Sequence, residues 1–227
     1  YAAFAVSLFL KDGVKLIVHW HSDIVKQKYL YFFFAPIENK VLKRADAIFV
    51  TSPNYLKYSE PLRRYEDKCV IVPNGISESK VVPKDDCEQF VQRIREKFGN
   101  KDIVYFMGRH VPYKGIEYLI MAEQYVKSDC VFVIAGGGPL TDELKKKCEG
   151  IERIKFVGVV PDDEICGYMK AASVFAFPSI TKNEAFGVVL AEAMFLRLPA
   201  VTFTIPGSGV NWVCVNEETG IEVPNRD

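Results

Sequence analysis

Short apolar runs alternate with longer amphipathic segments along most of the chain, and this alternation restricts the fold more than any other feature. The apolar runs predict strands at residues 14–20, 46–52, 69–75, 102–108, 130–138, 154–160, 173–179, 199–204 and 219–224. Segments of helical periodicity predict helices at residues 86–99, 115–126, 140–150, 161–172 and 187–197. Strands that alternate with helices form parallel sheets with crossover helices. The sequence therefore predicts an α/β fold.

The alternating pattern falls into two blocks that separate near residues 77–85. A chain of 227 residues has room for one or two domains of ordinary size. We therefore expect a partial N-terminal domain at residues 1–77 and a second domain at residues 78–227. The chain opens in the middle of an apolar run and stops soon after its last predicted strand, so we expect an incomplete chain.

Charge and cysteine content exclude several classes of function. The chain carries 29 basic and 29 acidic residues, which gives no general electrostatic reason to expect a nucleic-acid partner. Its six cysteines include no CxxC pair, so they are best interpreted as reduced thiols and not as zinc ligands. No apolar run approaches the ~20 residues of a membrane-spanning helix. These features predict a cytoplasmic protein.

Two cations follow the strand predicted at residues 102–108, in the loop "GRHVPYKG". Gly108 lets the chain turn, and Arg109 and Lys114 then lie beside the start of the next helix. Two cations near a helix N-terminus make a good anion site. The alternative is a pair of solvated surface cations. The later loop "AGGGPL" matches neither the dinucleotide fingerprint nor the P-loop.

Two carboxylates bracket an uncharged segment in "KNEAFGVVLAEAM". If a helix begins near Gly187, the backbone amides at its start can bind a phosphate. Glu184 and Glu192 can then reach hydroxyl groups on either side of that phosphate. The alternative is that Glu184 only favours the helix dipole and that Glu192 is exposed or paired with a neighbouring cation.

The segment "HWHSD" places His19, His21 and Asp23 at a spacing of two. On one strand these side chains would share a face, which suggests a metal site. The strand is expected to end near Trp20, which breaks the alternation. We therefore expect no metal. His21 is better interpreted as a hydrogen-bond partner of a ligand or as a satisfied loop residue.

Several motifs in a fixed order resemble one family. They are "VHWHSDIVKQK", "LKRADAIFVTSPNY", "KCVIVPNGI", "GRHVPYKGIEYLI", "FVIAGGGPL", "IKFVGVVPDDEICGYMKAASVFAFPS" and "EAFGVVLAEAM". Together they resemble the retaining glycosyltransferases of family 4, and Glu184 and Glu192 match that family's E-x7-E motif. The resemblance implies the GT-B fold, with two Rossmann-like domains that face each other across a cleft. It also implies a nucleotide diphosphate sugar as substrate, with no metal and no cofactor.

The resemblance assigns roles to individual residues. It implies that Arg109 and Lys114 hold the donor diphosphate, with Glu184 on the transferred sugar and Glu192 on the ribose. It places His21 near the sugar and the acceptor. The remaining donor-binding positions that it implies are Gly108, the backbone of Val160, and the amides of Phe186, Gly187 and Val188.

The leading hypothesis is a glycosyltransferase (of the hexosyltransferase type) of surface polysaccharide biosynthesis, with a glycan or lipid-linked acceptor. Residues 26–46 mix aromatic and basic residues, which predicts either peripheral contact with the inner face of the membrane or a buried helix with a polar outer face. The alternatives are a nucleotide-sugar epimerase of the same architecture and a non-catalytic nucleotide-sugar-binding protein. The segment "IPGSGVNWVC" departs from the commoner family pattern and resembles polysaccharide-assembly members.

Overall fold

The computed structural model describes residue 5 and residues 9–11, 13–23, 28–83 and 86–226. Contacts divide the chain into two compact units, each described by itself. The first unit contains Tyr1–Asn74, Lys182–Phe186 and Pro206–Trp212. The second unit contains Gly75–Thr181, Gly187–Ile205 and Val213–Asp227. The domain boundary expected after residue 77 stays a prediction.

The first unit is built on a parallel sheet in the order β1-β2-β3. The strands are β1 (Ile17–Trp20), β2 (Ala47–Val50) and β3 (Cys69–Ile71), and the helices are α2 (Lys28–Arg44), α3 (Pro53–Tyr58), α4 (Glu60–Arg63) and the 3₁₀ turn η1 (Glu66–Lys68). Leu42 of α2 packs with Ile48 and Val50 of β2 and with Tyr55 of α3 in a buried core. Burial of these apolar side chains stabilises the three-stranded sheet.

Two features of the first unit differ from the sequence prediction. The first strand begins at Ile17, three residues later than expected. Helix α3 was not expected, yet its start carries an ordinary signal. The Ser52 hydroxyl caps it by accepting a hydrogen bond from the amide of Tyr55 at 3.1 Å, and Pro53 fills the first helical position.

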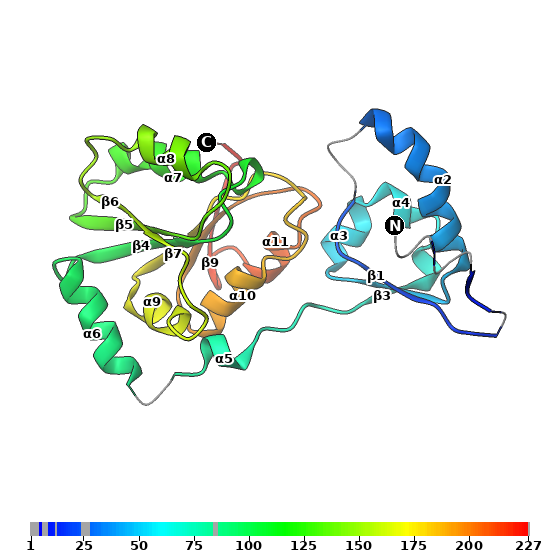
Figure 1. Ribbon diagram of the computed structural model, residues 1–227, viewed down its shortest axis with the longest axis horizontal. Coiled ribbons are helices and arrows are strands. Elements are labelled where there is room, and N and C mark those ends of the chain that lie inside the picture. Colours follow the sequence, from blue (N-terminus) through cyan, green and yellow to red (C-terminus); the bar gives the residue numbers. More distant parts are fainter. Residues whose placement is uncertain (1–4, 6–8, 12, 24–27, 84–85, 227) are drawn as a thin grey trace. The chain divides into compact units, whose positions relative to one another are not determined.

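The second unit contains a six-stranded, wholly parallel sheet in the order β6-β5-β4-β7-β8-β9 (Figure 1). The strands are β4 (Asp102–Met107), β5 (Cys130–Ala135), β6 (Ile154–Gly158), β7 (Val174–Phe177), β8 (Ala200–Phe203) and β9 (Gly220–Val223). The helices are α5 (Glu78–Val81), α6 (Cys87–Lys97), α7 (Ile116–Ala122), α8 (Thr141–Lys147), α9 (Ile165–Ala171) and α10 (Val188–Phe195), with the 3₁₀ turns η2 (Pro112–Lys114) and η3 (Glu123–Tyr125). Helix α11 (Val210–Val213) belongs to the first unit except for its last residue.

Helices cover both faces of this sheet. In Figure 1, α7 and α8 lie over one face, and α6, α9 and α10 lie on the other. Every residue of β5 is buried, which explains why its sequence is a continuous apolar run without alternation. Phe106 of β4 and Phe132 of β5 pack with Leu119 of α7 and Leu144 of α8. The sheet is therefore a rigid platform for the loops at its edges.

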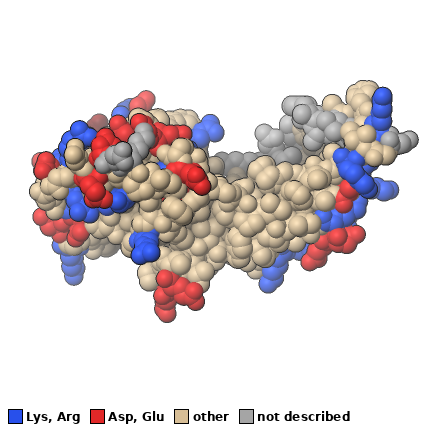
Figure 2. Space-filling model, turned by 90° about the horizontal axis from the view of Figure 1, so that it is seen from below, with Lys and Arg blue, Asp and Glu red and all other residues tan. Residues whose placement is uncertain are grey.

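The predicted α/β class with parallel sheets is confirmed. Helix α9 begins at Ile165 and not at residue 161, because residues 161–164 form a turn before it. In the part of the chain that the structure describes, no helix has the length and apolar character needed to cross a membrane. The face seen in Figure 2 carries acidic and basic side chains together.

Candidate functional site

Four loops leave the carboxyl ends of β6, β5, β4 and β7, which are neighbours in the sheet of the second unit. Backbone hydrogen bonds hold these loops to one another. Gly108 donates to the carbonyl of Ala135 at 3.2 Å, and Gly136 donates to the carbonyl of Gly158 at 2.7 Å. Ligands of open α/β sheets bind beside the carboxyl ends of the strands. This edge is therefore the candidate binding site of the second unit.

Glycines allow these loops to approach closely. Gly136 has a φ of 113°, and a Cβ on it would lie 1.9 Å from the carbonyl oxygen of Gly108. Gly115 has a φ of 60°, and a Cβ there would lie 2.1 Å from the carbonyl oxygen of Pro178. The glycine-rich loop after β5 thus packs against the backbone of the neighbouring loop.

Lys114 is the central cation of this edge. Lys114 is only 8% exposed, and its ammonium lies 4.7 Å from the centroid of the Phe177 ring. This distance is within the range of a cation–π interaction. Phe177 is the last residue of β7. Gly187 lies against the same ring, because a Cβ built on this glycine would be 3.4 Å from a ring carbon. Phe177 therefore brings the β4 loop and the start of α10 together.

The two neighbours of this cation on the β4 loop differ in burial. Arg109 is exposed. His110 is 1% exposed, its Nδ1 lies 2.9 Å from the Thr141 hydroxyl, and its amide donates to the carbonyl of Gly137 at 3.0 Å. Burial lowers the pKa of His110. His110 is therefore a buried anchor that fixes the loop carrying Arg109 and Lys114.

Helix α10 begins directly after Gly187, which has a φ of 86° and caps the helix. The leading amides of an α-helix have no acceptor within the helix, so they favour an anionic partner. These amides begin at Val188, beside the ring that carries the Lys114 ammonium. The start of α10 and the β4 loop thus supply two kinds of anion-binding group at one edge.

Glu192 is buried in α10 with 3% of its surface exposed. Burial raises the pKa of its carboxyl, the charge of Lys80 opposes that rise, and Asp162 adds to it. Lys80 itself pairs with Asp162 at 3.3 Å. Within the described residues, Glu192 Oε2 accepts no hydrogen bond. The interpretation of Glu192 as a solvent-exposed residue is wrong, and its carboxylate retains capacity to accept from a hydroxyl group.

Glu184 belongs to the first unit, in the segment of residues 182–186. The Ser208 hydroxyl donates to the carbonyl of Glu184. The carbonyl of Ala185 accepts from the Gly209 amide at 3.1 Å and from the Thr51 hydroxyl at 3.2 Å. Ser208, Gly209 and Thr51 were not identified from the sequence, because their partners lie far away along the chain.

His21 follows β1 in the first unit and is exposed. Its ring centroid lies 4.2 Å from that of His19, whose pKa is lowered by burial and by the neighbouring His21. Among the described residues, no group of three or more His, Cys, Asp and Glu side chains is arranged to hold a metal ion.

The structure brings part of the predicted site together. Lys114 and Gly187 both lie against the Phe177 ring in the second unit, and a Cβ on Gly108 would lie 3.7 Å from Cε of Lys114. The other predicted residues of the second unit are Arg109 on the same loop, Val160 in the loop after β6, and Val188 and Glu192 in α10. Those of the first unit are His21, Glu184 and Phe186, the last of which is buried with its ring 6.1 Å from that of Trp212.

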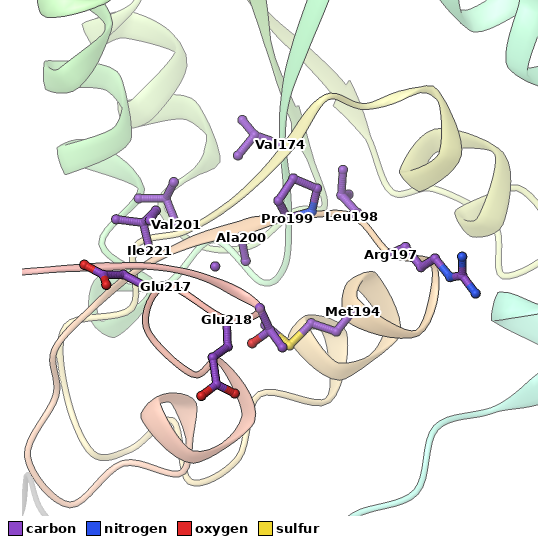
Figure 3. A pocket seen from close by; sticks show the side chains of 12 residues that line it. Val174, Met194, Arg197, Leu198, Pro199, Ala200, Val201, Glu217, Glu218 and Ile221 are labelled. Atoms are coloured by element: carbon purple, nitrogen blue, oxygen red, sulfur yellow. The ribbon is translucent and has the colours of Figure 1, made fainter.

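A cavity of about 530 Å³ lies elsewhere, at the amino ends of β7, β8 and β9. Val174, Ala200 and Ile221 line it, and the side chains of Arg197 and Glu218 lie at its margin (Figure 3). None of the predicted site residues lines this cavity. It occupies the sheet edge opposite the four loops, so it is distinct from the candidate site.

Known proteins resemble this chain over most of its length. It is 31% identical to the O-antigen chain mannosyltransferase C of Escherichia coli, over 97% of this chain and 58% of that protein. It is 32% identical to the D-rhamnosyltransferase WbpZ of Pseudomonas aeruginosa, over 92% of this chain and 54% of that protein. The chain thus spans little more than half the length of these relatives.

A solved structure shares the fold. The complex of HepE from Anabaena with UDP-glucose matches with a TM-score of 0.78 and 18% identity, over 98% of this chain and 61% of that one. The family described as "Glycosyl transferases group 1" matches residues 101–227, which is more than half of the chain. These residues include the β4 loop and α10, where the anion-binding groups meet. The chain belongs to the group 1 glycosyl transferases, and its fold is of the GT-B type.

Proposed function

We propose that this chain is part of a retaining glycosyltransferase that transfers a sugar from a nucleoside diphosphate sugar to a glycan or lipid-linked acceptor. The observation that carries the proposal is the buried ammonium of Lys114 over Phe177, where the loops of a parallel sheet converge. Family membership supports it. Two relatives are named as an O-antigen mannosyltransferase and a rhamnosyltransferase. Their names support sugar transfer over epimerisation, and they support a role in surface polysaccharide synthesis.

In this proposal Arg109 and Lys114 hold the donor diphosphate, and the amides of Phe186, Gly187 and Val188 join them. Sugar transfer builds negative charge on the departing diphosphate. Fixed cations and helix-end amides stabilise that charge without reorganisation. We therefore propose that the reaction needs neither a metal ion nor a cofactor. The UDP-glucose complex of HepE supports a nucleoside diphosphate sugar as the donor class.

The remaining roles follow the chemistry of each group. Glu184 accepts hydrogen bonds from hydroxyls of the transferred sugar. The Glu192 carboxylate, buried with Oε2 unpartnered in the described residues, suits the ribose hydroxyls. The backbone of Val160 meets the base, and His21 lies near the sugar and the acceptor. No residue is assigned as a nucleophile. We therefore propose that the acceptor attacks the anomeric carbon from the face that the diphosphate leaves, which retains the anomeric configuration.

We also propose that the protein works at the inner face of the cell membrane, through contact of α2 with acidic lipid headgroups. Phe32 and Phe33 of α2 are 79% and 74% exposed. Lys40 and Lys43, later in the same helix, are exposed too. Exposed aromatic rings followed by basic residues suit an interface between acyl chains and anionic headgroups.

The experiment that tests the proposed function uses the full-length protein. Release of nucleoside diphosphate is measured for a panel of UDP- and GDP-sugars in the presence of EDTA, and the sugar products are identified. We expect one donor to be cleaved. Glu184→Gln should reduce the rate by at least about tenfold, because a charged hydrogen-bond acceptor is lost.

The control is Glu152→Gln, which changes an exposed carboxylate in the turn before β6. It should retain the wild-type rate. Formation of a free epimer without diphosphate release would favour the epimerase instead. A loss of thermal stability in Glu184→Gln with normal specific activity would remove Glu184 from the site.

A further inference from the structure

The first unit contains a part-buried ion pair that the proposed roles do not use. The Lys182 ammonium lies 2.8 Å from Asp23 Oδ2, and the Asp23 side chain is only 7% exposed. Lys182 precedes Glu184 by two residues, and Asp23 follows His21 by two. The pair therefore joins the two segments of this unit that carry proposed catalytic residues.

Asp23 is held from several elements at once. Its Oδ1 accepts from the indole nitrogen of Trp20 at 3.0 Å and from the Ser59 hydroxyl at 2.7 Å. Its amide donates to the hydroxyl of Tyr55 in α3 at 2.5 Å. A buried carboxylate is stable only when its oxygens are satisfied in this way. Asp23 is thus a fixed acceptor in the loop after β1, to which Lys182 binds.

Lys182 reaches this acceptor beside Tyr58 and Gly207. A Cβ on Gly207 would lie 2.6 Å from Cβ of Tyr58 and 3.7 Å from Cδ of Lys182. The glycine therefore lets the backbone at residue 207 approach Tyr58 closely, beside the stem of Lys182. The ammonium also lies 3.4 Å from the carbonyl oxygen of Tyr58, a weaker contact than its contact with Asp23.

The backbone after Lys182 is fixed by the hydrogen bonds from Ser208, Gly209 and Thr51 to the carbonyls of Glu184 and Ala185. Lys182 is the side-chain anchor at the beginning of the same segment. We propose that Asp23 and Lys182 form a positioning pair that sets the Glu184 carboxylate relative to His21. This inference rests on the proposed sugar transfer, and neither residue of the pair touches the substrate.

The test compares three variants of the full-length protein. Lys182→Met removes the charge and keeps the length of the stem, whereas Lys182→Arg keeps the charge. Lys15→Met is the control, because it breaks another lysine–aspartate pair of the same unit, that of Lys15 and Asp46 at 3.0 Å. The measurements are kcat and KM for diphosphate release, the affinity for UDP and GDP, and amide hydrogen exchange in residues 183–187.

We expect Lys182→Met to lower kcat by at least about tenfold, since small displacements of catalytic groups cost about 10²-fold. Exchange in residues 183–187 should become faster. Affinity for the nucleoside diphosphate should stay within about twofold, because Lys114 lies in a separate unit. Lys182→Arg should recover most of kcat, and Lys15→Met should match the wild type.

An unchanged kcat in Lys182→Met would overturn the proposal. A lower thermal stability with unchanged exchange in residues 183–187 would also overturn it, because the pair would then be structural only. If the wild type releases diphosphate from no donor, the proposed sugar transfer fails. The exchange measurement still decides in that case whether the pair orders the Glu184 segment.

Discussion

At the scale of single residues, the most informative side chain is Lys114. The sequence predicted it as a cation beside a helix start, but neither its burial nor its ring partner could be inferred. Phe177 ends β7, which pairs with β4 although many residues separate the two strands. The contact of Lys114 with Phe177 depends on the order of the strands in the sheet, so the local sequence around Lys114 does not predict it.

Replacement of Lys114 by Met should separate the phosphate role from base binding. The variant keeps an apolar stem on Phe177 and removes the ammonium. We expect affinity for UDP or GDP to fall by at least about tenfold, because a charged contact to phosphate is lost. Affinity for the corresponding nucleoside should change by less than about twofold.

Calorimetric titration with each ligand measures both effects. Lys127→Met removes an exposed lysine after η3 and should behave as the wild type. Equal losses of affinity for the nucleoside and its diphosphate in Lys114→Met would contradict the phosphate role.

At the scale of elements, α10 carries a residue whose environment the sequence left open. Glu192 lies in an almost wholly apolar helix, so exposure, pairing with a cation and ligand binding were all compatible with the pattern. The structure buries it near Lys80 of α5 without a hydrogen bond to Oε2 among the described residues. Helix α5 was not predicted, because it is a single turn between the two blocks.

The raised pKa of Glu192 gives a pH-dependent prediction. The folded state binds this proton more tightly than the unfolded chain does. The free energy of unfolding therefore falls as the pH rises above 4.5, the ordinary pKa of a glutamate carboxyl. Glu192→Gln should therefore be more stable than the wild type near neutral pH, and the difference should vanish below about pH 4. Urea unfolding across this range measures it.

The same variant tests the ribose role. If Glu192 binds ribose, Glu192→Gln should weaken binding of the nucleoside and the nucleoside diphosphate by the same factor, unlike Lys114→Met. Unchanged affinity for both ligands would exclude the ribose role. A lower stability of the variant near neutral pH would contradict the account of the buried charge.

The segment of residues 206–212 is the element that fixes the Glu184 backbone. A Cβ on Gly209 would lie 2.3 Å from the carbonyl oxygen of Ala185. This oxygen is a backbone atom, so it moves only if residues 182–186 move with it. Gly209→Ala should lower kcat strongly and cost about 1–3 kcal/mol of stability by overpacking. Diphosphate release and thermal unfolding measure the two effects.

The control for this variant is Gly75→Ala, because a Cβ at Gly75 meets nothing within 4 Å. It should change stability by no more than about 0.5 kcal/mol. Normal turnover in Gly209→Ala would show that this segment does not position Glu184.

At the scale of the whole molecule, the alternation of strands and helices was enough to predict the α/β class. It could not give the strand order, because β7 returns to pair with β4 on the side away from β5. Nor could it predict that residues 182–186 and 206–212 pack with the first unit, since both segments lie within the second block of the sequence. Resemblance of ordered motifs gave the family, which the comparisons confirm.

The proposed membrane contact concerns the full-length protein and has its own test. Phe32→Ser combined with Phe33→Ser should weaken binding to vesicles containing phosphatidylglycerol by about tenfold or more, because burial of a Phe side chain contributes about 1.5–3 kcal/mol. Vesicle sedimentation measures it. Tyr125→Ser, which changes an exposed aromatic residue of the second unit, should have no effect. Equal binding of the double variant and the wild type would contradict contact through α2.

The most direct measurement of the central claim is calorimetric titration of the full-length protein with UDP- and GDP-sugars in EDTA. The account predicts that sugars of one nucleotide bind with a Kd between about 1 μM and 1 mM, the usual range for substrates of enzymes. Failure of every nucleotide sugar to bind, or binding that returns only when Mg²⁺ is added, would contradict a metal-free diphosphate site built on Lys114.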